Sequence, residues 1–179
     1  MNTDSSTEIL KYVLIWLNKR DIPSSKIALQ KMLFFLKESG IPMRFEFEAY
    51  SYGPFSRNVV ATTNELAVQN MIQVNRTQYT ILTSMDCNLQ NDVRDKIDRQ
   101  LTTFTALIDM DFKFDKLELF GSVLYCIRAL QEHETIPTQQ SVEKEFSAWK
   151  GNNYKSTDIC SAYHKLIQVF SNGDGHQPG

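Results

Sequence analysis

The spacing of apolar residues along the chain predicts a mainly helical protein. Apolar positions recur at helical intervals in seven segments. The second helix is expected to begin near Ser24 or Ser25, Ser56 fits as an N-cap residue, and Gly40 followed by Pro42 marks a helix end. The predicted helices cover residues 5–20, 24–40, 56–70, 91–108, 115–130, 138–149 and 157–170. The second of these is apolar on more than one face, which indicates a central position in the core.

Two stretches show strand patterns instead. Residues 44–50 alternate charged with apolar side chains, the period of a half-buried strand, and Tyr52-Gly53-Pro54 is expected to end it. Residues 72–74 and 79–82 flank the polar segment 75–78, which suits a hairpin turn. The order helix, helix, strand, helix and hairpin predicts a winged-helix-like unit.

These elements together predict an α+β fold that is mainly α with a small antiparallel β-sheet. We expect one domain over residues 1–170, with a winged-helix-like half at 5–84 packed on a helical half at 90–170, and a flexible tail at 171–179. A chain of 179 residues with 42% hydrophobic and 22% charged residues is typical of a globular domain.

Charge and hydropathy narrow the class of partner. The net charge of −2 provides no general attraction to phosphate or to anionic membranes. No run of apolar residues is long enough to span a bilayer, and residues 1–8 are polar and acidic. We therefore expect a cytoplasmic protein that does not act at a membrane.

Candidate catalytic and metal-binding residues are few and scattered. Three cysteines, an odd number, lie far apart, which argues against a disulfide framework. Only Cys160 has a histidine, His164, within five residues, and this single pair does not supply the four ligands of a structural zinc site. The three histidines accompany no recognisable nucleophile or metal spacing, and there is no glycine-rich phosphate loop. These residues are Cys87, Cys126, Cys160, His133, His164 and His176. The prediction is a protein without enzymatic activity, cofactor or metal; an enzyme would need His133 or His164 to converge with acidic groups in a pocket.

A winged helix usually reads DNA with its third helix and its wing. Here residues 55–70 contain one arginine and one glutamate, and the hairpin adds only Arg76. Phosphate binding normally needs several basic residues, so this count favours a protein partner over nucleic acid. The alternative, a nucleic-acid-binding regulator, would be favoured by a clustered basic face formed by Lys26, Lys31, Arg44, Arg57 and Arg76.

The segment Tyr50-Ser51-Tyr52-Gly53-Pro54-Phe55-Ser56 is the most distinctive in the chain. It has a structural interpretation, in which glycine and proline shape a corner, the aromatic rings pack and Ser56 caps the next helix. It also has a functional one, because tyrosines are enriched at interface hot spots.

A group of acidic residues, Asp109, Asp111, Asp115 and Glu118, lies farther along the chain. We interpret it as a solvated loop and helix start, with Asp115 and Glu118 forming a capping box. Its spacing does not match a calcium-binding loop.

The segments 29–36 (LQKMLFFL), 47–56 (FEAYSYGPFS) and the hairpin ending 79–82 (YTIL) resemble the Panacea domain family, which includes the SocA-like antitoxins. Later segments, 117–125 and 145–150, are similar to the YwgA-type branch. The resemblance implies a small helical scaffold that neutralises a partner protein by direct contact, in a toxin–antitoxin system or in phage or mobile-element defence. The partner would be a toxin, the target of a protease adaptor or a defence-system component.

The expected partner-binding surface follows from that resemblance and from the distinctive segment. We expect it at the corner and at the preceding helix, which the fold should bring close to it. Its residues are Gln30, Lys31, Tyr50, Tyr52, Gly53, Pro54, Phe55, Ser56 and Arg57. The sequence leaves open whether the protein also associates with itself.

Overall fold

The computed structural model describes residues 5–171 of the chain. Within this range it contains seven α-helices and two two-stranded antiparallel sheets, which confirms the predicted mainly α fold with a small antiparallel β-component. The elements are α1 (Ser5–Asn18), α2 (Lys26–Glu38), β1 (Glu48–Tyr50), β2 (Gly53–Phe55), α3 (Arg57–Val68), β3 (Ile72–Val74), β4 (Tyr79–Ile81), α4 (Asn91–Leu107), α5 (Phe114–Glu132), α6 (Gln139–Lys150) and α7 (Ser156–Phe170). Residues 1–4 and 172–179, which include His176 and most of the predicted tail, lie outside the described part.

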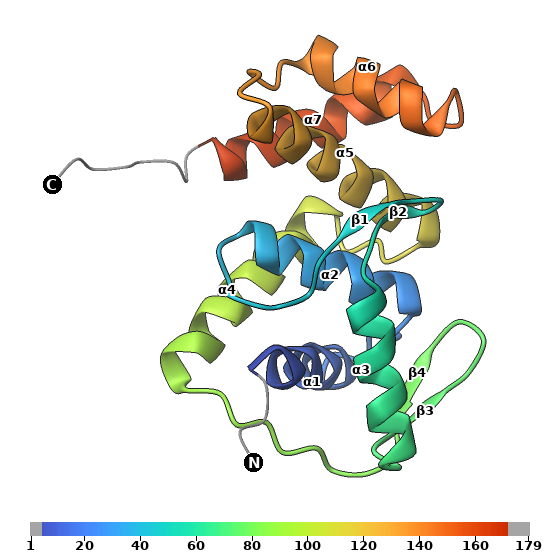
Figure 1. Cartoon of the computed structure of the whole chain (residues 1–179), viewed down its shortest axis with the longest axis vertical. Helices are drawn as coiled ribbons and strands as arrows, with labels where there is room; N and C mark the ends of the chain where they lie inside the picture. The colour runs from blue at the N-terminus through green and yellow to red at the C-terminus, as the bar shows by residue number, and fades with distance from the viewer. Residues whose placement is uncertain (1–4, 172–179) are drawn as a thin grey trace, which may run out of the picture.

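Helix α2 forms the centre of the molecule, as its apolar character predicts. Every residue from 28 to 36 is buried, and α2 packs against α1, α4, α5 and β2 (Figure 1). The hydroxyl of Ser25 accepts a hydrogen bond from the backbone N–H of Ala28 at 3.1 Å, which makes Ser25, rather than Ser24, the N-cap. Gly40 has a φ of +86° just after the helix, a conformation that only glycine adopts without strain.

The predicted hairpin of the winged-helix-like half forms from β3 and β4, and the segment before α2 makes one additional contact with it. In the β3–β4 hairpin, Ile72 pairs with Ile81 and Val74 with Tyr79. The segment before α2 pairs with the same hairpin, because the N–H groups of Lys26 and Tyr79 bond Thr77 O and Ser24 O at 2.9 Å. This contact is an isolated β-bridge between Ser25 and Gln78, and a single bridging residue is too short to show alternation in the sequence.

The strand predicted at residues 44–50 is wrong over most of its length. Only Glu48–Tyr50 is a strand. Gly53 and Pro54, expected with Tyr52 to end it, belong to the second strand of a hairpin, Gly53–Phe55. The backbone before Glu48 bonds side chains instead. Arg44 N donates to the hydroxyl of Ser6 at 2.8 Å, and Phe45 O accepts from Lys37 Nζ at 2.7 Å.

The two halves of the chain share one hydrophobic core. Phe35 of α2 contacts Phe104 of α4, with ring centroids 5.1 Å apart, and Phe170 of α7, at 5.4 Å. Helix α5 packs between α2 on one side and α6 and α7 on the other (Figure 1). Among the helices of residues 5–171, none combines the length and the apolar character needed to cross a membrane.

Candidate functional site

The β1–β2 hairpin lies where the two halves of the chain meet. It contacts α2 and α5, and its turn reaches the N-terminal end of α5 (Figure 1). We call residues 50–55 the hairpin tip. Tyr50 and Tyr52 are 51% and 60% exposed, whereas Gly53 and Pro54 are buried. The predicted segment therefore divides into two exposed rings and a buried backbone that supports them.

Gln30 fixes the end of the hairpin. Its side-chain amide donates to Ser56 O at 3.0 Å and accepts from Ser56 N at 2.9 Å, in the manner of a paired strand residue. Gln30 is only 4% exposed, so these bonds form away from water. Ser56 does occupy the N-cap position of α3, but its hydroxyl is buried without a hydrogen-bond partner, so the predicted capping bond does not form.

Lys31 holds the middle of the hairpin from below. Its Nζ donates to Pro54 O at 2.9 Å, and the residue is 3% exposed. Two glycines make room for it: a Cβ on Gly53 would lie 3.0 Å from Lys31 Cε, and one on Gly121 of α5 would lie 2.6 Å from Lys31 Cδ. A contact of 2.6 Å is shorter than real Cβ contacts, so Lys31 requires glycine at position 121. At position 53 the 3.0 Å contact would force the lysine to shift, and the φ of +96° there independently favours glycine.

Burial and, to a smaller extent, the nearby charge of Lys150 lower the pKa of Lys31 to about 7, and the charge of Glu118 partly opposes this shift. In the unfolded chain the amine keeps its ordinary pKa near 10.5. Unfolding therefore takes up a proton between pH 7 and 10.5. The contribution of Lys31 to the free energy of unfolding rises with pH across this window and is lost as the pH falls through 7.

A second buried lysine holds the turn of the hairpin. Lys150, the last residue of α6, donates to Ser51 O at 2.6 Å and to Glu118 Oε1 at 2.7 Å. The other oxygen of Glu118 accepts from the hydroxyl of Tyr154 at 2.9 Å. Burial, together with this hydrogen bond to a carboxylate, raises the pKa of Tyr154. Gln30, Lys31 and Lys150, which we call the anchor residues, thus fix the hairpin at three points.

Sequence reasoning missed the roles of Lys150, Glu118 and Tyr154. The predicted capping box at Asp115 and Glu118 is wrong, because α5 begins at Phe114 with Lys113 as its N-cap. The Glu118 carboxylate bonds Lys150 and Tyr154 instead. In the sequence, the resemblance of residues 145–150 to the YwgA-type branch drew attention to the segment that contains Lys150. It gave no indication that Lys150 bonds Glu118 and Ser51.

The exposed rings of the hairpin tip rest on other aromatic residues. Tyr50 stacks on Phe55 with ring centroids 5.2 Å apart, and Tyr52 meets Phe114 edge-on at 5.0 Å. Phe114 is itself 43% exposed. Arg57, also predicted at this surface, forms an ion pair with Glu48 at 3.2 Å in which both side chains are largely exposed. Such a pair contributes little to stability.

A groove of about 790 Å³ opens beside the tip. Tyr52 lines it from the hairpin, Phe120 from α5, and Trp149 and Tyr154 from the α6 side. Its charged side chains are of both signs: Asp111, Asp115, Glu118, Asp158, Lys113, Lys116, Lys150 and Lys155. This mixture of aromatic, acidic and basic groups suits a protein surface better than a polyanion.

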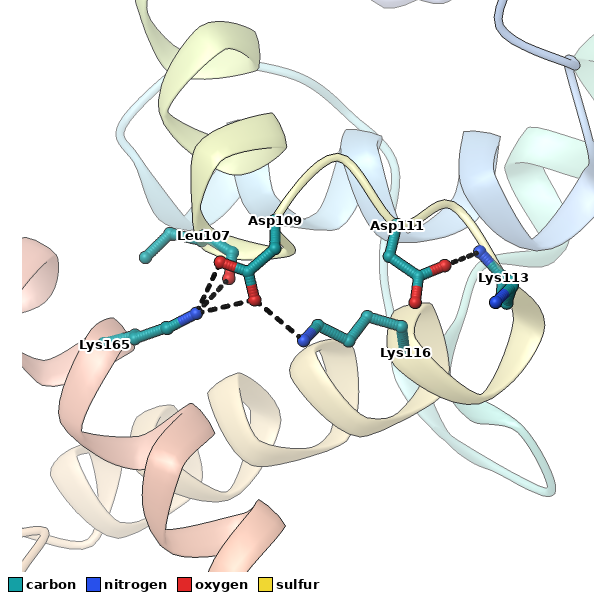
Figure 2. Close-up of polar contacts among 6 residues, drawn as sticks. All are labelled: Leu107, Asp109, Asp111, Lys113, Lys116 and Lys165. Atoms are coloured by element: carbon teal, nitrogen blue, oxygen red, sulfur yellow. Dashed lines mark hydrogen bonds and ion pairs between the residues drawn. The ribbon is translucent and has the colours of Figure 1, made fainter.

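The acidic loop before α5 has a structural role in the described chain. Figure 2 shows Asp109 between two helices, with its carboxylate 2.8 Å from Lys165 Nζ of α7 and 3.0 Å from Lys116 Nζ of α5. These hydrogen bonds lower the pKa of Asp109. Asp111 accepts from the backbone N–H of Lys113 at 3.1 Å, just before α5 begins. The loop therefore joins α5 to α7 at its solvent-exposed edge.

The described residues give no support to a metal site or to a histidine-based active site. His133 is the exposed C-cap of α5, and His164 is exposed on α7, 3.2 Å from the amide oxygen of Gln139. Within residues 5–171, no three histidine, cysteine or acidic side chains converge as metal ligands. The thiols Cys87, Cys126 and Cys160 are unpaired, and burial raises the pKa of Cys126 to about 12.

The five basic residues that would favour nucleic-acid binding do not all reach the surface. Lys31 points into the protein and is 3% exposed, and Arg57 is paired with Glu48. On α3 the exposed side chains include Val60 and Val68, at 36% and 83%. The exposed residues of α3 also include Asn58, Asn64 and Glu65, and its single basic residue is Arg57, so this helix is unlike a phosphate-binding surface.

No protein-family model matches the sequence of this chain, and no curated protein matches it.

Proposed function

We propose that this protein is a non-enzymatic, antitoxin-like interaction module that binds a partner protein through the hairpin tip. The observation that carries the proposal is the combination of two tyrosine rings more than half exposed and a backbone beneath them fixed by three buried side chains. A surface that is rigid before binding loses little conformational entropy when the complex forms. Tyrosine provides a large contact area with a polar end, which is why it is common at hot spots.

The resemblance to the Panacea domain family supports the proposal that the partner is a protein which this chain neutralises. We propose a toxin or a defence-system protein in the cytoplasm, neutralised by direct contact. In this proposal Gln30 and Lys31 act by holding the tip, since both are buried, while Tyr50, Tyr52 and the neighbouring groove touch the partner.

An affinity pull-down from lysate of the source organism tests the proposal. The tagged protein is used at low and high salt, with and without nuclease, and the retained material is identified by mass spectrometry. We expect one stoichiometric protein that survives both nuclease and salt. Recovery of nucleic acid that is lost as the salt concentration rises would favour a nucleic-acid-binding regulator and contradict the proposal.

Variants at the tip make the test specific. Tyr52→Ala and Tyr50→Ala should each weaken binding of the retained protein by about 10-fold or more, because an exposed aromatic hot spot contributes about 2 kcal/mol. Their thermal stability should stay close to that of the wild type. The matched control is Ile136→Ala, which removes another exposed apolar side chain, 79% exposed, away from the hairpin. Equal binding by all four proteins would exclude the tip as the interface.

A further inference from the structure

Lys31 lies in a site built for an uncharged amine. Among the residues that the structure describes, Pro54 O is the one hydrogen-bond acceptor of its Nζ. A protonated lysine has three donors, and each donor left unpaired in a buried site is unfavourable. Gly53 and Gly121 approach the side chain closely: an added Cβ would lie 3.0 Å from Lys31 Cε at position 53 and 2.6 Å from Lys31 Cδ at position 121. The hydroxyl of Ser122 lies beside Gly53, and it too is buried, with no hydrogen-bond partner among the described residues.

The charges around Lys31 also favour the neutral form. On α6, Lys150 repels a second positive charge. On α5, Glu118 attracts it, but both Glu118 oxygens already accept hydrogen bonds from Lys150 and Tyr154. The neighbours on β2 are Gly53 and Pro54, which carry no charge. Together with burial, this arrangement lowers the pKa of Lys31 to about 7.

We propose that Lys31 is a proton-controlled latch of the hairpin: the neutral amine holds the tip on α2, and the protonated amine releases it. Lys31 leaves its slot when it gains a proton, because the slot cannot supply the acceptors that an ammonium group needs. Release is confined to the residues between the two remaining anchors, since Gln30 continues to hold Ser56 and Lys150 continues to hold Ser51 O. Residues 52–55 would be ordered above about pH 7 and mobile below it.

The consequence for binding rests on the function proposed above, whereas the latch itself does not. If the tip must be ordered to bind, one proton linked to release with a midpoint near pH 7 weakens binding about 10-fold between pH 8 and pH 6. The complex would then respond to acidification of the cell.

The latch is tested on the free protein by NMR. Lysine ¹³Cε shifts report protonation, and the amide signals of Ser51, Tyr52 and Gly53 report the tip, both followed from pH 5.5 to 9.5. We expect Lys31 Cε and the three amides to titrate together near pH 7 in the wild type. In Lys31→Met the amide titration should disappear. In Glu118→Gln its midpoint should move to lower pH, because the charge that stabilises the ammonium is removed.

His164→Gln is the control for titration elsewhere, since His164 is exposed on α7, and it should leave the hairpin titration unchanged. The latch would be contradicted if Lys31 Cε titrated with a midpoint above pH 9, or if the three amide signals did not follow the titration of Lys31. Both results are obtained from the wild-type protein, so they do not depend on the folding of any variant. Binding of the partner at pH 6 and pH 8 is then compared between wild type and Lys31→Met. Absence of any partner at both pH values would count against the proposed function alone.

Discussion

Glu118→Ala is expected to destabilise the protein by about 3 kcal/mol, measured by urea unfolding at pH 7.5. The change leaves Lys150 Nζ, whose side chain is 5% exposed, without its counter-charge, and it leaves the Tyr154 hydroxyl without its main acceptor. Removing one partner of a buried ion pair costs more than the pair contributes, because the remaining charge stays buried. We expect the amide signals of the hairpin turn to change as well, since Lys150 also holds Ser51 O.

Asp109→Ala is the matched control for this prediction. Asp109 also bonds two partners, Lys116 and Lys165, but its side chain is 59% exposed. Water replaces the lost contacts there, so the expected loss of stability is small. A loss of stability in Glu118→Ala as small as that in Asp109→Ala would show that the buried cluster does not hold the hairpin.

Gly121→Ala is expected to destabilise the protein by about 2 kcal/mol, opposite in sign to the usual effect of this change within a helix. Alanine normally stabilises a helix interior relative to glycine by about 1 kcal/mol. At position 121 the added Cβ would lie 2.6 Å from Lys31 Cδ and 3.1 Å from Cε, which forces a buried side chain out of place. Urea unfolding of both proteins gives the difference directly.

The double variant Lys31→Ala with Gly121→Ala separates this clash from other effects. Without the long side chain there is room for the new methyl group. In the Lys31→Ala background, Gly121→Ala should become neutral or stabilising by up to about 1 kcal/mol. The same destabilisation in both backgrounds would contradict the packing of Lys31 against Gly121.

Local signals predicted the elements that form from neighbouring residues. Ser25 caps α2 and Gly40 follows its end, because caps and left-handed glycines depend on a few adjacent positions. The wing was found from residues 72–82 for the same reason. The strand at 44–50 failed because distant side chains, Ser6 and Lys37, occupy the backbone that a partner strand would have used.

The sequence predicted which residues of the candidate site lie close together, but not which of them are buried. The sequence and the family resemblance pointed to Gln30, Lys31 and the Tyr50–Arg57 segment as one surface, and the structure does bring them together. Helix α2 is apolar on several faces, so its pattern gave no indication that both polar side chains point inward. Lys150 bonds Ser51, 99 residues away, and no short-range pattern reveals such a pair.

The most direct test of the central claim is photo-crosslinking from the hairpin tip in living cells of the source organism. A photoreactive phenylalanine analogue replaces Tyr52 in one protein and Ile136, 79% exposed, in the other. If the tip is the interface, irradiation should join position 52 to one defined protein and position 136 to none. Crosslinks of equal yield from both positions, or crosslinks from position 52 to nucleic acid, would contradict the account.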